Sequence, residues 1–279
     1  MSDSPIGTEP SITKSPCSPR ILAVVNQKGG VGKTTTTINL ATALAASGQS
    51  VLIVDLDPQG NASTGIGIAP ARRGVGTYAI LLDDAAPDAA ALSTFVPNLS
   101  IIAAEQDLAG AEIELVTADR REFRLRDALL TPSFSRFDYI LIDCPPSLGL
   151  LTLNGLVAAH AVLVPLQCEF FALEGLSQLM RTIERVRQSL NPPLRVQGIV
   201  LTMYDRRNNL SDLVAADARG FFGGQVYETM IPRNIRVSEA PSHGKPVILY
   251  DYRSPGAQAY IRLAQELLRR ERTLAEEQQ

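Results

Sequence analysis

Short apolar runs alternate with longer segments of helical periodicity along most of this chain. The runs occupy residues 21–25, 51–54, 99–103, 137–143, 161–165 and 194–202. Within residues 173–190, apolar side chains recur every three or four positions, which is typical of a helix with one apolar face. Runs that are apolar throughout are typical of a parallel sheet covered on both faces. The pattern therefore predicts an α/β fold, a doubly wound, mainly parallel sheet with helices on both faces.

Length and composition fit one domain of this kind. The chain has 279 residues, and 45% of them are hydrophobic. A single α/β domain of roughly 250 residues buries a substantial core, and we place it at residues 20–271. Residues 1–19 are rich in Ser and Pro and are predicted to be a disordered N-terminal tail. Residues 272–279 are predicted to be a polar C-terminal tail.

Cysteine usage and hydropathy limit the cellular context. Cys17, Cys144 and Cys168 are odd in number and widely spaced, which fits neither a disulfide framework nor a cysteine metal site. A reducing cytoplasm is therefore expected. No apolar run approaches the ~20 residues that span a bilayer, so we expect no transmembrane helix.

A glycine-rich stretch at residues 28–35 separates the first apolar run from a helical segment. It reads Lys28, Gly29, Gly30, Val31, Gly32, Lys33, Thr34, Thr35. Glycines let backbone N–H groups turn toward an anion, and the helix N-terminus adds partial positive charge. In such a loop Lys33 reaches the β- and γ-phosphates, and the Thr34 hydroxyl ligates Mg²⁺. The alternative, a glycine-rich turn that binds nothing, is disfavoured by the strand–loop–helix context.

Aspartates follow two of the apolar runs. Asp55 and Asp57 come at the end of the second run, and Asp143 ends the run at 137–143. In open α/β sheets, ligands bind at the carboxyl ends of the strands, and carboxylates beside a polyphosphate require Mg²⁺ or ordered water. We expect Asp143 to hold Mg²⁺ through a water. For Asp55 and Asp57 the alternative is a turn with a helix cap, which Asp-Pro favours.

The glycine-rich stretch departs from the general phosphate-loop pattern at Gln27, where Gly is usual, and it adds a second lysine, Lys28. In this respect it resembles the deviant Walker A loop of the ParA/MinD class of P-loop ATPases. Asn26 and Gln27, together with later segments, resemble ParA-type partition ATPases in particular. The resemblance extends from about residue 20 to about residue 271.

This resemblance implies roles for individual residues. By its position Lys28 could reach a phosphate of its own site or of one across a dimer interface, and the resemblance implies contact with the nucleotide of the partner subunit. Asp57 would orient the attacking water and take part in the Mg²⁺ site with Thr34 and Asp143. Asp55 would support the Mg²⁺ shell or Lys33. Met203 and Pro232 would hold the adenine.

Arginines in the later part of the chain suggest a DNA surface. The candidates are Arg206, Arg207, Arg219 and Arg236. Several arginines in adjacent loops can bind a phosphate backbone without reading bases. From composition alone, surface charge paired with nearby acidic residues is the better interpretation, since the net charge is −3. The resemblance implies that Arg207 and Arg236 match the key DNA-binding arginines of partition ATPases, with Arg206 and Arg219 as further candidates.

A separate charged run lies at residues 120–126. We predict that it lies on a helix as a solvated face, with phosphate binding as the less favoured alternative.

The resemblance implies a function as well as a fold. A homodimer would form around Mg-ATP, bind double-stranded DNA nonspecifically and hydrolyse ATP slowly. A ParB-type centromere-binding protein would stimulate hydrolysis, and the output would be chromosome or plasmid segregation by a cytoplasmic, nucleoid-associated protein.

Two other classes on the same fold are disfavoured. A MinD-like membrane-surface or other cargo-positioning ATPase is the main alternative. Membrane attachment would need an amphipathic C-terminal anchor, whereas residues 274–279 are acidic and polar, so we expect no membrane partner. An iron–sulfur carrier would need suitably spaced cysteines, which Cys144 and Cys168 do not provide.

Overall fold

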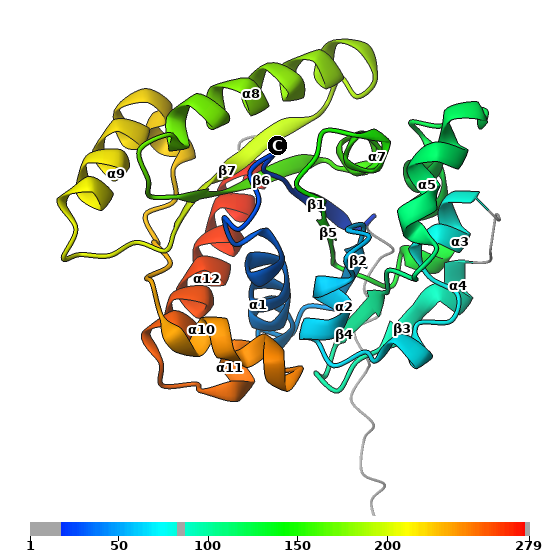
Figure 1. Cartoon of the computed structure of the whole chain (residues 1–279), viewed down its shortest axis with the longest axis horizontal. Helices are drawn as coiled ribbons and strands as arrows, with labels where there is room; N and C mark the ends of the chain where they lie inside the picture. The colour runs from blue at the N-terminus through cyan, green and yellow to red at the C-terminus, as the bar shows by residue number, and fades with distance from the viewer. Residues whose placement is uncertain (1–17, 83–86, 277–279) are drawn as a thin grey trace, which may run out of the picture.

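A seven-stranded sheet forms the centre of the computed structural model, which describes residues 18–82 and 87–276 (Figure 1). The strands are β1 (Arg20–Val24), β2 (Val51–Asp55), β3 (Ala91–Ser93), β4 (Leu99–Ile102), β5 (Tyr139–Asp143), β6 (Ala161–Gln167) and β7 (Arg195–Thr202). Their order across the sheet is β3-β4-β2-β5-β1-β6-β7. Every pairing is parallel except that of β3 with β4 at one edge. The predicted α/β class with a mainly parallel sheet is confirmed.

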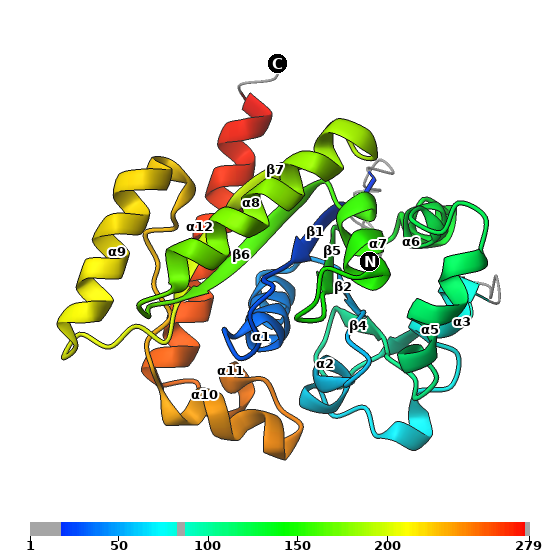
Figure 2. The same cartoon turned by 45° about the horizontal axis from the view of Figure 1, so that its top comes forward.

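Helices cover both faces of this sheet (Figures 1 and 2). Packed on one face are α1 (Lys33–Ala46), α2 (Asn61–Gly65), α11 (Val247–Tyr250) and α12 (Pro255–Glu276). Packed on the other are α3 (Thr77–Leu82), α5 (Leu108–Glu114), α6 (Arg124–Leu129), α7 (Leu150–Ala158), α8 (Ala172–Ser189) and α9 (Asn209–Phe222). The remaining helices are α4 (Pro87–Ala90), α10 (Ile235–Glu239) and 3-10 turns at Pro70–Arg72, Leu115–Thr117, Pro132–Phe134, Gly223–Gln225 and Ala240–His243.

The strands are apolar throughout because each of their faces meets a helix layer. Successive side chains of a strand point to opposite faces. In β1, Ile21 and Ala23 pack into the core on the α7 and α8 side, and Leu22 and Val24 pack into the core on the α1 and α12 side. The stripe predicted within residues 173–190 is also confirmed, since its buried members on α8 face the first of these cores.

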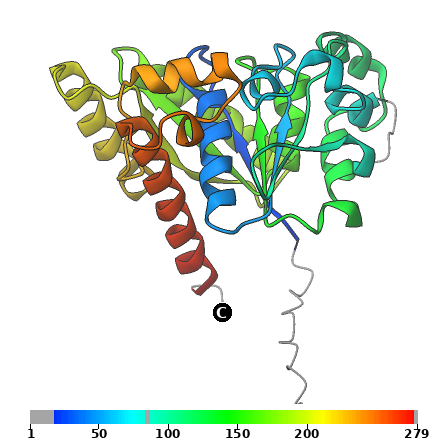
Figure 3. The same cartoon turned by 90° about the horizontal axis from the view of Figure 1, so that it is seen from below.

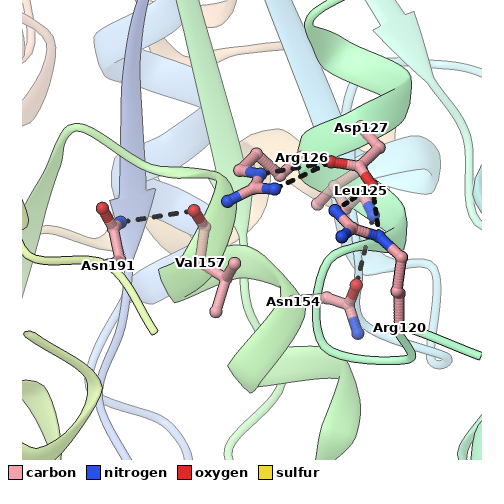
Figure 4. Close-up of polar contacts among 7 residues, drawn as sticks. All are labelled: Arg120, Leu125, Arg126, Asp127, Asn154, Val157 and Asn191. Carbon is pink, nitrogen blue, oxygen red and sulfur yellow. Dashed lines mark hydrogen bonds and ion pairs between the residues drawn. The ribbon is translucent and has the colours of Figure 1, made fainter. Parts of the chain in front are cut away.

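The charged run at residues 120–126 is not one helix, which corrects that part of the prediction. Arg120 has φ 50°, a left-handed conformation that an α-helix does not accommodate, and α6 begins only at Arg124. Arg120 and Arg126 both pair with Asp127, and the Asn154 side chain accepts the N–H of Leu125 at 3.1 Å (Figure 4). Arg120 is exposed, whereas residues 121–124 and 126 are partly buried and Leu125 is fully buried, so only part of the run is a solvated face.

The two ends of the predicted domain meet at the amino ends of the parallel strands. Arg20, which begins β1, pairs with Glu271 of α12 at 3.0 Å. Figure 3 shows the last turns of α12 (red) on the side where β1 begins and α10 (orange) on the opposite side, toward the carboxyl ends of the strands. Helix α12 continues past residue 271 to Glu276. The predicted tails fall largely on residues 1–17 and 277–279, which lie outside the described residues.

None of the described helices is long and apolar enough to cross a membrane. The apolar residues Tyr260, Leu263 and Leu267 of α12 are buried in the core. This face of α12 is therefore occupied by the sheet and by α1.

Candidate functional site

The glycine-rich stretch forms a tight loop between β1 and α1. Gly30 has φ 76° and Gly32 has φ 89°, conformations that side chains with a Cβ rarely adopt. Gly32 is also the N-cap of α1 and supplies no capping side chain, so the first N–H groups of the helix remain available to an anion. The loop is also held by the end of β7, because the Thr202 hydroxyl donates to the Val31 carbonyl at 2.8 Å.

Lys33 points back over this loop. Its side chain is buried, and its Nζ donates to the Lys28 carbonyl at 2.9 Å. Burial lowers the pKa of Lys33, and the nearby carboxylates of Asp143 and Asp57 act in the opposite direction. The ammonium group of Lys33 thus lies against the backbone of the loop, near the carboxyl groups of Asp143 and Asp57.

Two carboxyl groups end neighbouring strands next to the loop. Asp55 of β2 pairs in register with Asp143 of β5, and both are fully buried. Thr37 of α1 donates its hydroxyl to Asp143 Oδ1 at 3.1 Å, whereas Asp143 Oδ2 has no hydrogen-bond partner among the described residues. Burial raises the pKa of Asp143 to about 8, and the charge of Asp55 adds to the rise.

The open oxygen of Asp143 is a fit for a divalent cation. A buried carboxylate oxygen without a partner is costly, and Mg²⁺ takes oxygen ligands from one or two carboxylates, hydroxyls, phosphates and water. The Thr34 hydroxyl also lies close enough to Asp143 to lower its pKa. No cluster of three or more His, Cys, Asp or Glu that could hold a metal ion is found within residues 18–82 and 87–276.

Asp55 and Asp57 have different surroundings. Asp55 Oδ2 accepts both the N–H of Ser63 at 2.8 Å and its hydroxyl at 2.6 Å, so this carboxyl anchors the start of α2. Burial raises the Asp55 pKa to about 6, while the Ser63 hydrogen bonds oppose the rise. Asp57 accepts the N–H of Gln59 at 3.0 Å within its own turn and is near enough to Lys33 to affect its pKa.

Lys28 does not enter its own loop. Its side chain is 48% exposed, and its Nζ forms an ion pair with Glu169, which follows β6. The neighbouring Gly29 is exposed, and a Cβ added there would meet nothing within 4 Å. The second lysine of the stretch is therefore directed toward the surface, unlike Lys33.

A cavity of about 180 Å³ adjoins the loop. Gly32 and Thr35 line one side, and Met203, Pro232 and Tyr260 are among the residues of the others. The structure thus brings Met203 and Pro232 together beside the loop, where the adenine was expected. Met203 has φ 51°, which places it at a sharp turn directly after β7.

Three of the predicted arginines, Arg206, Arg207 and Arg236, lie on segments that meet in space, and Arg219 lies apart from them in the last turn of α9. Residues 203–208 run beside residues 230–236, since Tyr204 pairs with Pro232 as an isolated bridge. Arg206 and Arg207 lie in the first segment and Arg236 on α10, while Arg219 lies on α9 (Figures 1 and 2). Arg207 pairs with Asp205 at 2.8 Å and Arg236 with Glu239 at 3.0 Å, so these guanidinium groups are exposed but not free of acidic partners.

Two further arginines line the same surface pocket, of about 740 Å³, as Arg206 and Arg207. They are Arg233 and Arg262. Neither was among the candidates chosen from the sequence, and Arg262 could not be, because it lies on α12 and comes near the others only through the tertiary fold. Proximity to Arg236 was the only available signal for Arg233.

Comparison with known proteins places this site in context. A family model described as an AAA domain matches residues 19–196. The chain is 61% identical to the chromosome partitioning protein ParA of Caulobacter vibrioides, over 91% of this chain and 95% of that protein. It is 54% identical to the sporulation initiation inhibitor protein Soj of Bacillus subtilis, over 89% of this chain and 98% of that protein.

A similar solved structure is a cobyrinic acid a,c-diamide synthase from Mycobacterium smegmatis with bound ADP and magnesium. It is 42% identical and has a TM-score of 0.78, covering 91% of this chain and 96% of that one.

The raised pKa of Asp143 gives a testable pH dependence. In the unfolded chain this carboxyl has a pKa near 3.8, and in the nucleotide-free fold it is about 8. The folded state therefore holds the proton more tightly, so the stability due to this group is complete below pH 4 and is lost as pH rises toward 8. Asp143→Asn has no carboxyl group to ionise at this position. Its free energy of unfolding should therefore fall less between pH 5 and pH 9 than that of wild type, by at least about 1 kcal/mol.

Urea unfolding of both proteins at several pH values, without nucleotide, measures this difference. Asp138→Asn is the matched control, because Asp138 lies just before the same strand and accepts a backbone N–H from Ser50. An equal decline in wild type and Asp143→Asn would contradict the prediction.

Proposed function

Because the chain belongs to the ParA/Soj family of chromosome-partitioning ATPases, we propose that it is an Mg-ATP-dependent partition ATPase whose ATP-bound dimer binds DNA nonspecifically. The observation that carries the proposal is the pair of lysines in one phosphate loop. Lys33 is buried over the loop, and Lys28 is exposed and directed away from it. A loop built for one polyphosphate needs only the first, so the second is available to a nucleotide outside this subunit.

ATP hydrolysis follows from the site geometry. The loop N–H groups and Lys33 would bind the phosphates and stabilise charge that develops on the γ-phosphoryl group. Thr34 and Asp143 would hold Mg²⁺, which neutralises phosphate charge when bound. Asp57 would accept a hydrogen bond from the attacking water and align it with the γ-phosphorus. Water attack forms the new P–O bond as the bond to the β–γ bridging oxygen breaks, giving ADP and phosphate.

Nucleotide-dependent DNA binding is supported by shared residues. Pro232, Arg233 and Asn234 line both the cavity beside the phosphate loop and the arginine-lined pocket. A nucleotide in the first cavity would contact the segment that carries the DNA-binding side chains. Salt-sensitive contacts of Arg206, Arg207, Arg219 and Arg236 with phosphates would then recruit the dimer to the nucleoid.

In this scheme a ParB-type centromere-binding protein stimulates hydrolysis, which dissolves the dimer and releases DNA. The cycle would move chromosome or plasmid copies apart. Higher identity to ParA and Soj than to the cobyrinic acid a,c-diamide synthase favours this output over a biosynthetic one.

The dimer is tested by Gly29→Val. A Cβ at Gly29 meets nothing within 4 Å in the single chain, and its φ is not in the left-handed range. The variant should therefore fold and bind ATP with wild-type affinity, yet fail to dimerise, because a second subunit approaching Lys28 would meet the added bulk. Sedimentation velocity with ATP and Mg²⁺ measures the dimer.

Gly224→Val is the control for this experiment, since Gly224 also has open space around it but lies beside the last turns of α12. It should dimerise normally. An ATP-dependent dimer of Gly29→Val as stable as that of wild type would count against two subunits meeting at this loop.

The DNA surface is tested by retention on nonspecific duplex DNA with no nucleotide, ADP or ATP. Wild type should bind only with ATP and should release as salt rises. Arg207→Ala/Arg236→Ala should weaken ATP-dependent binding by roughly tenfold or more while leaving ATP binding and dimerisation intact.

Arg121→Ala/Arg187→Ala is a matched control. Arg187 pairs with Glu184 three residues away, as Arg236 does with Glu239, and Arg121 pairs with a near neighbour, as Arg207 does. Both lie away from the arginine-lined pocket. Equal loss in the two double variants would mean a general charge effect, and no DNA binding in any nucleotide state would remove the partition function while leaving the ATPase assignment in place.

A further inference from the structure

Arg73 connects three segments around the turn that carries Asp57. It follows the 3-10 turn Pro70–Arg72, and its guanidinium group is partly buried. Nη2 donates to the Thr64 hydroxyl at 2.7 Å and to the Gly60 carbonyl at 3.3 Å, Nη1 donates to the Ala104 carbonyl at 3.0 Å, and Nε lies 3.4 Å from the Ile68 carbonyl.

All of these acceptors are uncharged. Within residues 18–82 and 87–276, Arg73 makes no ion pair with a carboxylate. A planar guanidinium with five N–H donors can bond several carbonyls in fixed directions, which an ammonium group cannot. The neighbouring Arg72 is exposed and makes no such contacts among the described residues. The guanidinium group of Arg73 therefore bonds three backbone carbonyls and the Thr64 hydroxyl and does not pair with an acidic side chain.

The bonded carbonyl of Gly60 belongs to the turn that begins at Asp57. The N–H of Gly60 donates to the Asp57 carbonyl at 2.8 Å, which closes the turn, and Gly60 has φ 61°. A Cβ on Gly60 would lie 2.1 Å from Arg73 Nη1, so the guanidinium packs directly on the glycine. Arg73 therefore holds Gly60, the last residue of this turn, in place.

The other side of the turn is fixed from the sheet. Asp55 accepts the N–H and the hydroxyl of Ser63, and the Ser63 hydroxyl in turn accepts the N–H of Ala104. Arg73 reaches the carbonyl of the same Ala104. The turn between Asp57 and Gly60 is therefore held at two points, Asp55 on one side and Arg73 on the other. The Asp57 side chain accepts its hydrogen bond from the N–H of Gln59, within this turn, so the direction of the carboxylate depends on the turn.

We propose that Arg73 is a positioning residue for ATP hydrolysis, which holds the Asp57–Gly60 turn so that the Asp57 carboxylate can align the attacking water. This inference rests on the role proposed above for Asp57. Arg73 itself touches neither the phosphate loop nor the carboxyl group of Asp57. Its effect is on the chemical step, since it has no contact with the loop that binds the phosphates.

Single-turnover hydrolysis of ATP by excess full-length protein tests the proposal, together with the affinity for a fluorescent ATP analogue. Arg73→Gln should slow hydrolysis roughly 10- to 100-fold, the effect expected from a small displacement of a catalytic group, and should change the analogue affinity by less than about twofold. Arg72→Gln, the matched control, should match wild type in both. Arg73→Lys, which keeps the charge but not the fork of donors, should fall between wild type and Arg73→Gln.

A double-mutant cycle with Asp57→Asn identifies the route of the effect. If Arg73 acts through Asp57, Arg73→Gln should cause little further loss in the Asp57→Asn background. A purely structural role would lower the rate equally in both backgrounds and would overturn the inference, as would an unchanged rate in Arg73→Gln. If Arg73→Gln fails to fold, Arg73→Lys in both backgrounds gives the same comparison.

The same cycle separates the two proposals. A rate lost in Asp57→Asn but kept in Arg73→Gln removes only the inference about Arg73. A rate kept in Asp57→Asn removes the water-aligning role of Asp57 and, with it, the role of Arg73.

Discussion

The carboxyl edge of this sheet depends on the burial of two acidic side chains against each other. Asp55 and Asp143 end adjacent parallel strands in register, and neither has access to solvent. Asp55 is satisfied by Ser63, but Asp143 keeps one oxygen without a partner among the described residues. An ionised carboxylate in that position costs several kcal/mol unless a cation or further donors accompany it. The nucleotide-free fold is consequently less stable at a pH at which Asp143 is ionised. A cation bound with the phosphates would offset the free-energy cost of burying that charge. Ligand binding and folding stability are thereby linked through one oxygen atom.

The elements that could be predicted are those specified by local physics. Strands apolar on both faces, and a loop with glycines at positive φ before a helix, are visible in the sequence because each follows from a single segment. The pairing of Asp55 with Asp143 is different, since it requires β5 to insert between β2 and β1, and nothing local to either strand specifies that order. The prediction that residues 120–126 form one helix was wrong because it, too, depended on tertiary surroundings that the sequence does not show. The left-handed backbone of Arg120 depends on its surroundings and not on a glycine, so the sequence does not reveal it.

Contacts between distant segments account for the rest of what sequence reasoning missed. Arg262 joins the arginine-lined pocket because α12 passes beside the segment after β7, and Arg233 joins it because residues 230–236 run beside that segment. Arg73 is a comparable case. Its sequence neighbour Arg72 has the same side chain and a solvent-exposed position, and only the fold directs one of the two guanidinium groups toward Gly60, Thr64 and Ala104. Residue type alone could not distinguish them.

The two lysines of the phosphate loop differ in how firmly they are held, and this difference suits a loop that serves two subunits. Lys33 is buried and bonded to the backbone of its own loop, so it is in place before any ligand arrives. Lys28 is half exposed and pairs with Glu169, an arrangement that contributes only about 0–1 kcal/mol in most proteins. Breaking the ion pair with Glu169 so that Lys28 can bind a phosphate therefore costs little free energy. A phosphate oxygen buried between two subunits would interact with the lysine more strongly, because solvent and salt would screen it less. A lysine held loosely at the surface can remain paired in the single chain and would still be released in the proposed dimer, when a second nucleotide-bound subunit approaches.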